Sequence, residues 1–178
     1  MQLGWFATLA ILSVASSAFA AGSEADNMAA AANGFYGVYR TFHPSDGIPS
    51  DADRAKYAPF LSPALETLLS EAGAAEARFS KANKDSPPLL EGDLFTSMFE
   101  GATSIQLATC SGDGKKGRCS VKLEYDDKTA KTTTWNDTVF LVNTSTGWRV
   151  DDIAYGGSWA FGNKGRLTEL LRQTAGLP

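Results

Sequence analysis

The sequence predicts an α+β fold in which N-terminal helices pack on one face of a curved antiparallel sheet of about four strands. Apolar residues recur with a helical period between residues 35 and 79, and they alternate with polar residues from residue 103 onward. Short turn segments separate the alternating runs, which is typical of strands joined by hairpins. The composition, 43% hydrophobic and 20% charged, is ordinary for a single globular domain.

The first helix is predicted from four apolar residues at helical spacing, which are Phe35, Val38, Tyr39 and Phe42. The Pro- and Gly-containing loop 43–50 ends it, and a short helical piece from about Asp51 to Tyr57 follows. A better marked helix then begins, with Ser62 as the N-cap and Pro63 at the first helical position. The segment 91–102 is expected to form a loop and a helical turn.

Four strands are expected next. The first runs from Ser104 to Cys110, and residues 119–125 alternate between apolar and polar, as a strand with one wet face does. Residues 132–143 are rich in β-branched and aromatic residues, which favours a central strand, and residues 147–155 complete the meander. A closing helix is expected within residues 167–177.

The N-terminus predicts export. Residues 1–20 are mostly apolar, carry no charged side chain and end in Ala18-Phe19-Ala20, the small-residue pattern of a signal peptidase site. We therefore expect a signal peptide at 1–20, a single domain at 24–178, and a periplasmic or extracellular location without stable membrane insertion after cleavage. An uncleaved anchor is the alternative, because residues 3–21 are long enough to span a bilayer.

The cysteine content agrees with export. The only two cysteines, Cys110 and Cys119, flank eight residues rich in Gly and Lys, which predicts a disulfide at the neck of a flexible hairpin loop. A redox pair is the alternative, but such pairs usually have the C-x-x-C spacing, which is absent.

Several function classes find no support in the composition. The net charge of -4 and the scattered basic residues give no footprint for nucleic acid. The single histidine, His43, cannot build a histidine-based metal site or complete a convincing catalytic triad. We therefore expect no metal and no cofactor.

The order of elements and four short motifs support a family resemblance. GFYGVY at 34–39, LSPAL at 61–65, GDLF at 92–95 and GWRVDDIAY at 147–155 resemble an uncharacterised family of bacterial exported proteins. That family is assigned the cone-shaped fold of nuclear transport factor 2. The resemblance covers about residues 34–170 and implies the same cone, a fold that serves isomerases, dehydratases and non-catalytic binding domains alike.

The adjacent acids Asp151 and Asp152 lie where the strand pattern changes phase. Val150 and Ile153 cannot share a face under strict alternation, so either both faces of the sheet are covered or a β-bulge shifts the phase by one residue. Asp151 would then pair with Arg149 on the surface. Asp152 would be either a structural acceptor for backbone N–H groups of the bulge or of the GDLF loop, or a cavity carboxylate able to transfer protons.

Four further residues are candidates for ligand binding. Tyr39 could place its hydroxyl in a cavity, and Asp93 could act as an acid, although a core ring and a turn cap are the simpler roles. Trp148 could line a pocket or fill the cone. Trp159 lies in the glycine-rich loop 155–166, which would form a binding loop or pack against the sheet edge.

These observations favour an exported, non-catalytic domain that binds a small ligand or a protein partner, and a homodimer is compatible with the sequence. One alternative is a small cavity enzyme of the isomerase or dehydratase type that uses Asp152 as general acid or base. A second is an envelope immunity-type protein that binds a toxin. An enzyme requires Asp152 inside an open cavity, whereas a protein binder requires an exposed apolar patch near Trp159 and Phe161.

Overall fold

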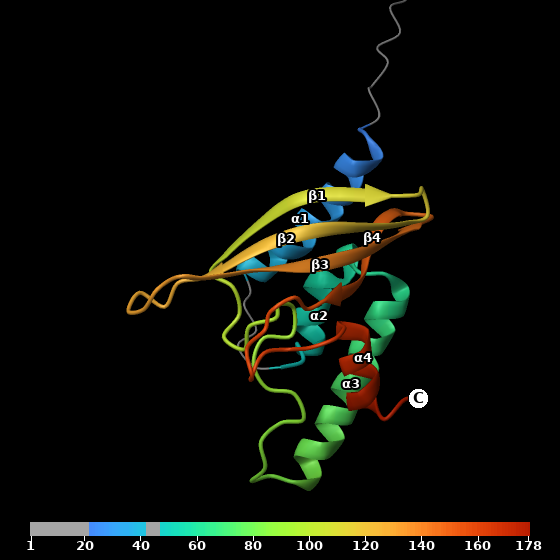
Figure 1. The fold of residues 1–178 in the computed structure, drawn as a ribbon. Coiled ribbons are helices and arrows are strands. Elements are labelled where there is room, and N and C mark those ends of the chain that lie inside the picture. Colours follow the sequence, from blue (N-terminus) through green and yellow to red (C-terminus); the bar gives the residue numbers. More distant parts are fainter. Residues whose placement is uncertain (1–21, 42–46) are drawn as a thin grey trace, which may run out of the picture.

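The computed structural model describes residues 22–41 and 47–178, so the predicted signal peptide, Phe42 and His43 lie outside the described residues. The elements of the fold, in chain order, are α1 (Glu24–Thr41), α2 (Asp51–Tyr57), the 3-10 turn η1 (Ala58–Phe60), α3 (Pro63–Ala82), β1 (Ser104–Gly112), β2 (Lys116–Tyr125), β3 (Thr133–Thr144), β4 (Gly147–Ala154) and α4 (Leu167–Ala175) (Figure 1). This order confirms the predicted α+β class, with helices first and a four-stranded antiparallel sheet after them.

The strands lie side by side in chain order, β1-β2-β3-β4, and the sheet is visibly curved (Figure 1). Helix α1 packs against β1, β2 and β4, while α3 and α4 pack against each other at the side of β4. Side chains from α1, α3 and the core face of the sheet form one hydrophobic core, with Phe35, Leu65 and Val139 fully buried. None of the helices in the described chain is long and apolar enough to cross a membrane.

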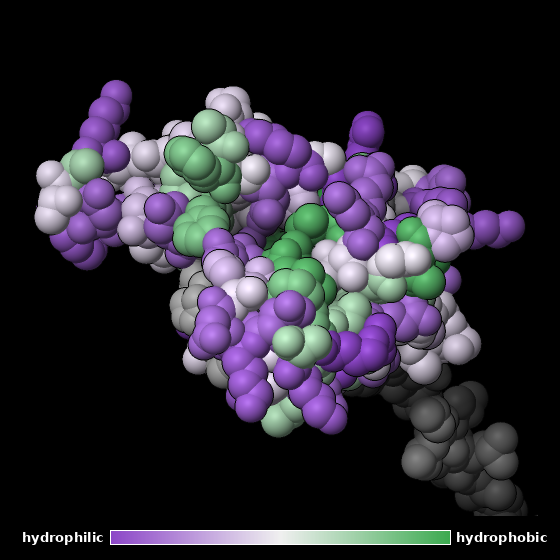
Figure 2. Space-filling view, turned by 90° about the horizontal axis from the view of Figure 1, so that it is seen from below, coloured by the Kyte–Doolittle hydropathy of each residue, from purple (hydrophilic) through white to green (hydrophobic). Residues whose placement is uncertain are grey.

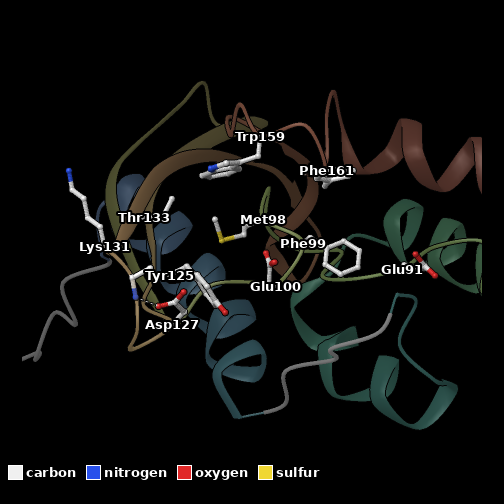
Figure 3. Close-up of a pocket in the computed structure, with 12 residues that line it drawn as sticks. Glu91, Met98, Phe99, Glu100, Tyr125, Asp127, Lys131, Thr133, Trp159 and Phe161 are labelled. Carbon is white, nitrogen blue, oxygen red and sulfur yellow. Dashed lines mark hydrogen bonds between the residues drawn. The ribbon is translucent and has the colours of Figure 1, made fainter.

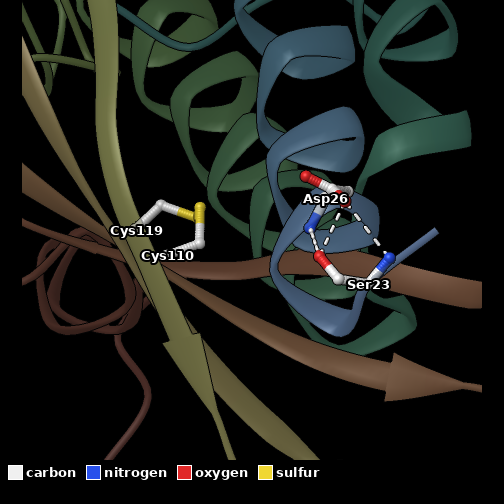
Figure 4. Close-up of a disulfide and its surroundings, with 4 residues drawn as sticks. All are labelled: Ser23, Asp26, Cys110 and Cys119. Carbon is white, nitrogen blue, oxygen red and sulfur yellow. Dashed lines mark hydrogen bonds between the residues drawn. A yellow bond between two sulfur atoms is a disulfide. The ribbon is translucent and has the colours of Figure 1, made fainter.

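Helix α1 begins well before the predicted apolar stripe. The Ala-rich segment ahead of Phe35 carries no stripe of large side chains, but alanine has the highest intrinsic helix propensity. The start of the helix is closed by a reciprocal pair of hydrogen bonds (Figure 4): Ser23 N–H donates to Asp26 Oδ2 at 3.1 Å, and Asp26 N–H donates to Ser23 Oγ at 3.2 Å. The predicted cap of α3 is confirmed, since Leu65 N–H donates to Ser62 Oγ at 3.0 Å.

The predicted disulfide joins Cys110 to Cys119 (Figure 4). The two cysteines are direct cross-strand neighbours, and β1 and β2 continue past them to Gly112 and Lys116. The flexible loop expected between the cysteines is therefore reduced to a short turn at residues 113–115. Asp113 holds this turn, because its Oδ1 accepts hydrogen bonds from the N–H groups of Lys115 at 3.0 Å and of Lys116 at 2.8 Å.

The outer edge of β4 is covered by two segments from elsewhere in the chain. Ser62 N–H donates to Val150 O at 2.8 Å, and Tyr155 N–H donates to Gly165 O at 3.1 Å. The start of α3 and the approach to α4 thus satisfy edge groups that would otherwise be open to pairing with another strand.

Candidate functional site

The predicted β-bulge is present at Asp151-Asp152. Leu141 of β3 pairs with Val150 and Phe140 pairs with Asp152, which leaves Asp151 as the extra residue. Because of this insertion, Val150 and Ile153 both face the core and are fully buried. Asp152 shares a face with its cross-strand partner Phe140, opposite the core face.

The Asp152 carboxylate accepts three hydrogen bonds, and the one from Arg166 is also an ion pair. Its Oδ1 accepts from Ile153 N–H at 2.9 Å and from Thr168 N–H at 3.0 Å, and its Oδ2 accepts from Arg166 Nη1 at 2.7 Å. Thr168 lies in the first turn of α4. A carboxylate at this position accepts a hydrogen bond from an otherwise unpaired N–H group, and its negative charge interacts favourably with the helix dipole. Asp152 therefore anchors α4 to the bulge, and the second partner segment is α4, not the GDLF loop.

The surroundings of Asp152 differ from those of an apolar cavity. The Arg166 guanidinium lies 4.0 Å from the centroid of the Phe140 ring and covers the carboxylate. Asp152 lines a cleft of about 300 Å³, but Arg166 and the further basic residues Lys116 and Arg172 line the same cleft. The expected surface pair between Asp151 and Arg149 does not form, because Arg149 donates to Trp148 O at 2.9 Å and to Thr146 Oγ1 at 3.0 Å.

Tyr39 and Asp93 lie together, but in a closed interior. The Tyr39 hydroxyl donates to Asp93 Oδ2 and accepts from Ala102 N–H at 2.9 Å. Asp93 also accepts from Phe95 N–H at 2.7 Å and from the Thr96 hydroxyl at 2.9 Å, which matches the turn-capping role. Burial and the Asp93 charge raise the pKa of Tyr39 well above its usual range. This network fixes the loop 91–102, in which the expected helical turn is absent.

Asp137 is a buried carboxylate that the sequence analysis did not single out. It accepts hydrogen bonds from Ser97 N–H at 2.9 Å, Gly156 N–H at 2.8 Å and Trp135 Nε1 at 3.2 Å. The available signal was the alternation of β3, which puts Asp137 in phase with the apolar residues Trp135 and Val139. Asp137 therefore ties the loop 91–102 to the loop that follows β4.

An open cleft with a volume of about 610 Å³ lies at the end of the sheet where β2 ends and β3 begins (Figure 3). The residues that line it come from three segments, the loop 91–102, the β2–β3 connection and the glycine-rich loop, and are Glu91, Met98, Phe99, Glu100, Tyr125, Asp127, Ala130, Lys131, Thr133, Trp159, Phe161 and Gly162. Trp159 lies across the cleft from Tyr125, with Met98 between them (Figure 3). Figure 2 views the molecule from the side of the loops and shows apolar residues gathered in and around a hollow.

Two rings at this cleft are unusually exposed for their size. Phe161 is 90% exposed and Phe99 is 44% exposed. Trp159, by contrast, is fixed by an edge-to-face contact with Trp135 at a centroid distance of 5.1 Å. The cleft thus combines a rigid aromatic wall with an apolar rim that faces solvent.

The glycine-rich loop is bound firmly to the loop 91–102. Asn163 Nδ2 donates to Asp93 O at 2.6 Å and to Thr96 O at 2.8 Å, and Gly157 N–H donates to Ser97 Oγ at 2.9 Å. A side chain at Gly157 would meet the Trp159 ring at 2.1 Å, so glycine is required for this close approach. The base of the cleft is therefore preformed.

Of the five residues that the sequence suggested for ligand binding, Trp159 alone lines this cleft. Trp148 is mostly buried and lines a separate cleft of about 540 Å³ near the start of α1, together with Phe60 and Asn27. Tyr39, Asp93 and Asp152 take part in the internal networks described above. Within residues 22–41 and 47–178, no group of three or more His, Cys, Asp or Glu residues could hold a metal ion.

Comparison with known proteins gives no match, either to a protein-family model or to a curated protein. Fold and site together define an α+β domain with a four-stranded antiparallel sheet and an aromatic cleft at one end of that sheet.

Proposed function

We propose that this chain is an exported, non-catalytic binding domain with a nuclear transport factor 2-like cone, and that the aromatic cleft holds a small apolar ligand. The observation that carries the proposal is the cleft itself. Its volume of about 610 Å³ falls in the range of small-molecule sites, which are typically apolar, concave and largely preformed.

The exposed rings of Phe161 and Phe99 favour binding of a ligand in the cleft. Covering a phenylalanine side chain contributes about 1.5–3 kcal/mol, and Phe161 leaves nearly all of that contribution unused in the free protein. Phe99 adds to the same rim. A ligand of moderate size that contacts both rings and the Trp159 wall would gain this free energy without rearranging the loops.

The cone and the export are supported by separate features. Helices that precede a curved antiparallel sheet agree with the cone architecture, in which the cleft would be the open end. The Cys110–Cys119 disulfide agrees with an oxidising compartment, where such bonds persist. The signal-like segment 1–20 adds to this support.

A non-catalytic role agrees with the state of the buried acids. Asp93, Asp137 and Asp152 each accept at least three hydrogen bonds from protein groups, and none of them lines the aromatic cleft. A general acid or base must reach a substrate atom through a free oxygen, directly or through one water. We therefore assign a structural role to these three carboxylates.

The test is equilibrium binding of the neutral fluorescent probe N-phenyl-1-naphthylamine to the purified protein. We expect saturable binding that Phe161→Ala weakens about tenfold or more, as loss of a covered ring predicts. Leu177→Ala is the matched control, because it also removes an exposed apolar side chain but lies outside the cleft. Absence of saturable binding, or equal affinity in both variants and the wild type, would overturn the proposal.

A further inference from the structure

Carboxylates outnumber cations at the rim of the aromatic cleft. Glu91, Glu100 and Asp127 line it, and Lys131 is the one basic residue among its lining residues. The Lys131 side chain extends away from the other lining residues, whereas the Glu100 carboxylate lies between Met98 and Phe99 (Figure 3). The charge that a ligand meets in this cleft is therefore negative.

These carboxylates are not neutralised by partners in the described chain. The side chains of Glu91 and Glu100 take part in no hydrogen bond or ion pair there. Asp127 accepts hydrogen bonds from the backbone N–H groups of Thr129 at 2.8 Å and Ala130 at 2.6 Å. Those bonds lower the pKa of the Asp127 carboxyl, so it stays ionised in mildly acidic surroundings.

The apolar part of the cleft is unusually aromatic. The rings of Phe99, Tyr125, Trp159 and Phe161 come from three segments of the chain and converge on the same space. The face of an aromatic ring carries negative charge density and attracts cations, and cages of such rings recognise alkylated ammonium groups. The rings and the carboxylates therefore favour the same sign of ligand charge.

We propose that the ligand of this cleft is an organic cation, an amine or quaternary ammonium group that carries an apolar chain or ring. This inference rests on the proposed function and adds to it the charge of the ligand. The apolar body would contact Met98 and the rings, and the cationic group would lie near Glu100. A neutral ligand leaves the carboxylates without a partner, and an anionic ligand is repelled by them.

The test compares three ligands that share a ten-carbon chain and differ in charge. The competitors of N-phenyl-1-naphthylamine are decyltrimethylammonium and decyl sulfate, each below its micelle concentration, and decanol below its solubility limit. We expect the cation to displace the probe at a concentration at least tenfold lower than the anion, with decanol between them. The advantage of the cation should shrink as salt is raised, because the carboxylates are at the rim.

The substitution Glu100→Gln tests whether the Glu100 carboxylate is responsible for the preference for the cation. We expect this variant to reduce the preference for the cation over decanol several-fold, while Glu71→Gln, which neutralises an exposed glutamate of α3, leaves the ratio unchanged. The ratio is measured within each variant, so a general loss of affinity does not imitate the result. Equal displacement by all three ligands would overturn the proposal that the ligand is a cation, but not the proposal that the cleft binds a ligand. Failure of the probe to bind would overturn the proposed function itself.

Discussion

Two tyrosines one turn apart on α1 provide a stringent test of the interior, because the same substitution should have opposite effects on them. Tyr36 and Tyr39 are both fully buried, with ring centroids 6.1 Å apart. The Tyr36 hydroxyl has no hydrogen-bond partner in the described structure, whereas the Tyr39 hydroxyl bonds to Asp93 and to Ala102 N–H. Replacement by phenylalanine removes only the hydroxyl in each case.

The expected magnitudes follow from these contacts. A buried polar group without a partner costs about 1–3 kcal/mol, so Tyr36→Phe should raise the free energy of unfolding by about 1 kcal/mol. Tyr39→Phe deprives the buried Asp93 carboxylate of a donor and Ala102 N–H of its acceptor. This substitution should lower the free energy of unfolding by about 2–3 kcal/mol. The two variants should therefore differ by about 3–4 kcal/mol in spite of identical chemistry.

Urea unfolding followed by tryptophan fluorescence measures both values, and an unchanged m-value shows that the unfolded state is not the cause. Tyr39→Phe should also lower the melting temperature by several degrees. Equal destabilisation by both substitutions would refute the reasoning, because it would require a partner for the Tyr36 hydroxyl.

Three further predictions concern the framework. Asp152→Asn removes the charge that anchors α4 and should lower the free energy of unfolding by about 1–2 kcal/mol in urea unfolding, and an unchanged stability would exclude the anchoring role. Replacing both Cys110 and Cys119 by serine should cost about 2–3 kcal/mol on the chain-entropy model for a sequence separation of 9, measured against the wild type with and without reductant. Four buried tyrosines have pKa values raised above 10.0 by burial, so the folded state binds their protons more tightly than the unfolded state does. These groups should leave stability unaffected below about pH 10 and lower it at higher pH, and urea midpoints at pH 8, 10 and 11 that do not fall would contradict this.

The framework could be predicted where local chemistry determines it. Ser62 followed by Pro63 marks the start of α3, because a hydroxyl acceptor and a missing N–H both suit the first turn. The phase conflict between Val150 and Ile153 allowed two explanations, a covered second face or a bulge at Asp151-Asp152, and the register of β3 and β4 shows the bulge.

The cleft could not be predicted in the same way. Phe99 and Phe161 are far apart in the sequence, and the bonds that bring their loops together run from Asn163 and Gly157 to backbone and hydroxyl groups of the loop 91–102. Neither loop has a periodic pattern that shows where its side chains point. Trp159 and Phe161 were recognised because two aromatic residues in a glycine-rich loop are unusual.

The most direct test of the central claim is a two-dimensional ¹⁵N–¹H NMR titration of the purified protein with N-phenyl-1-naphthylamine. We expect the amide shift changes to concentrate at residues 98–100 and 159–162, which include residues that line the cleft. Little change is expected near Trp148 and in α4, which lie elsewhere in the fold. Shifts centred on Asp152 and α4, or no saturable shifts at all, would contradict the assignment of the aromatic cleft as the binding site.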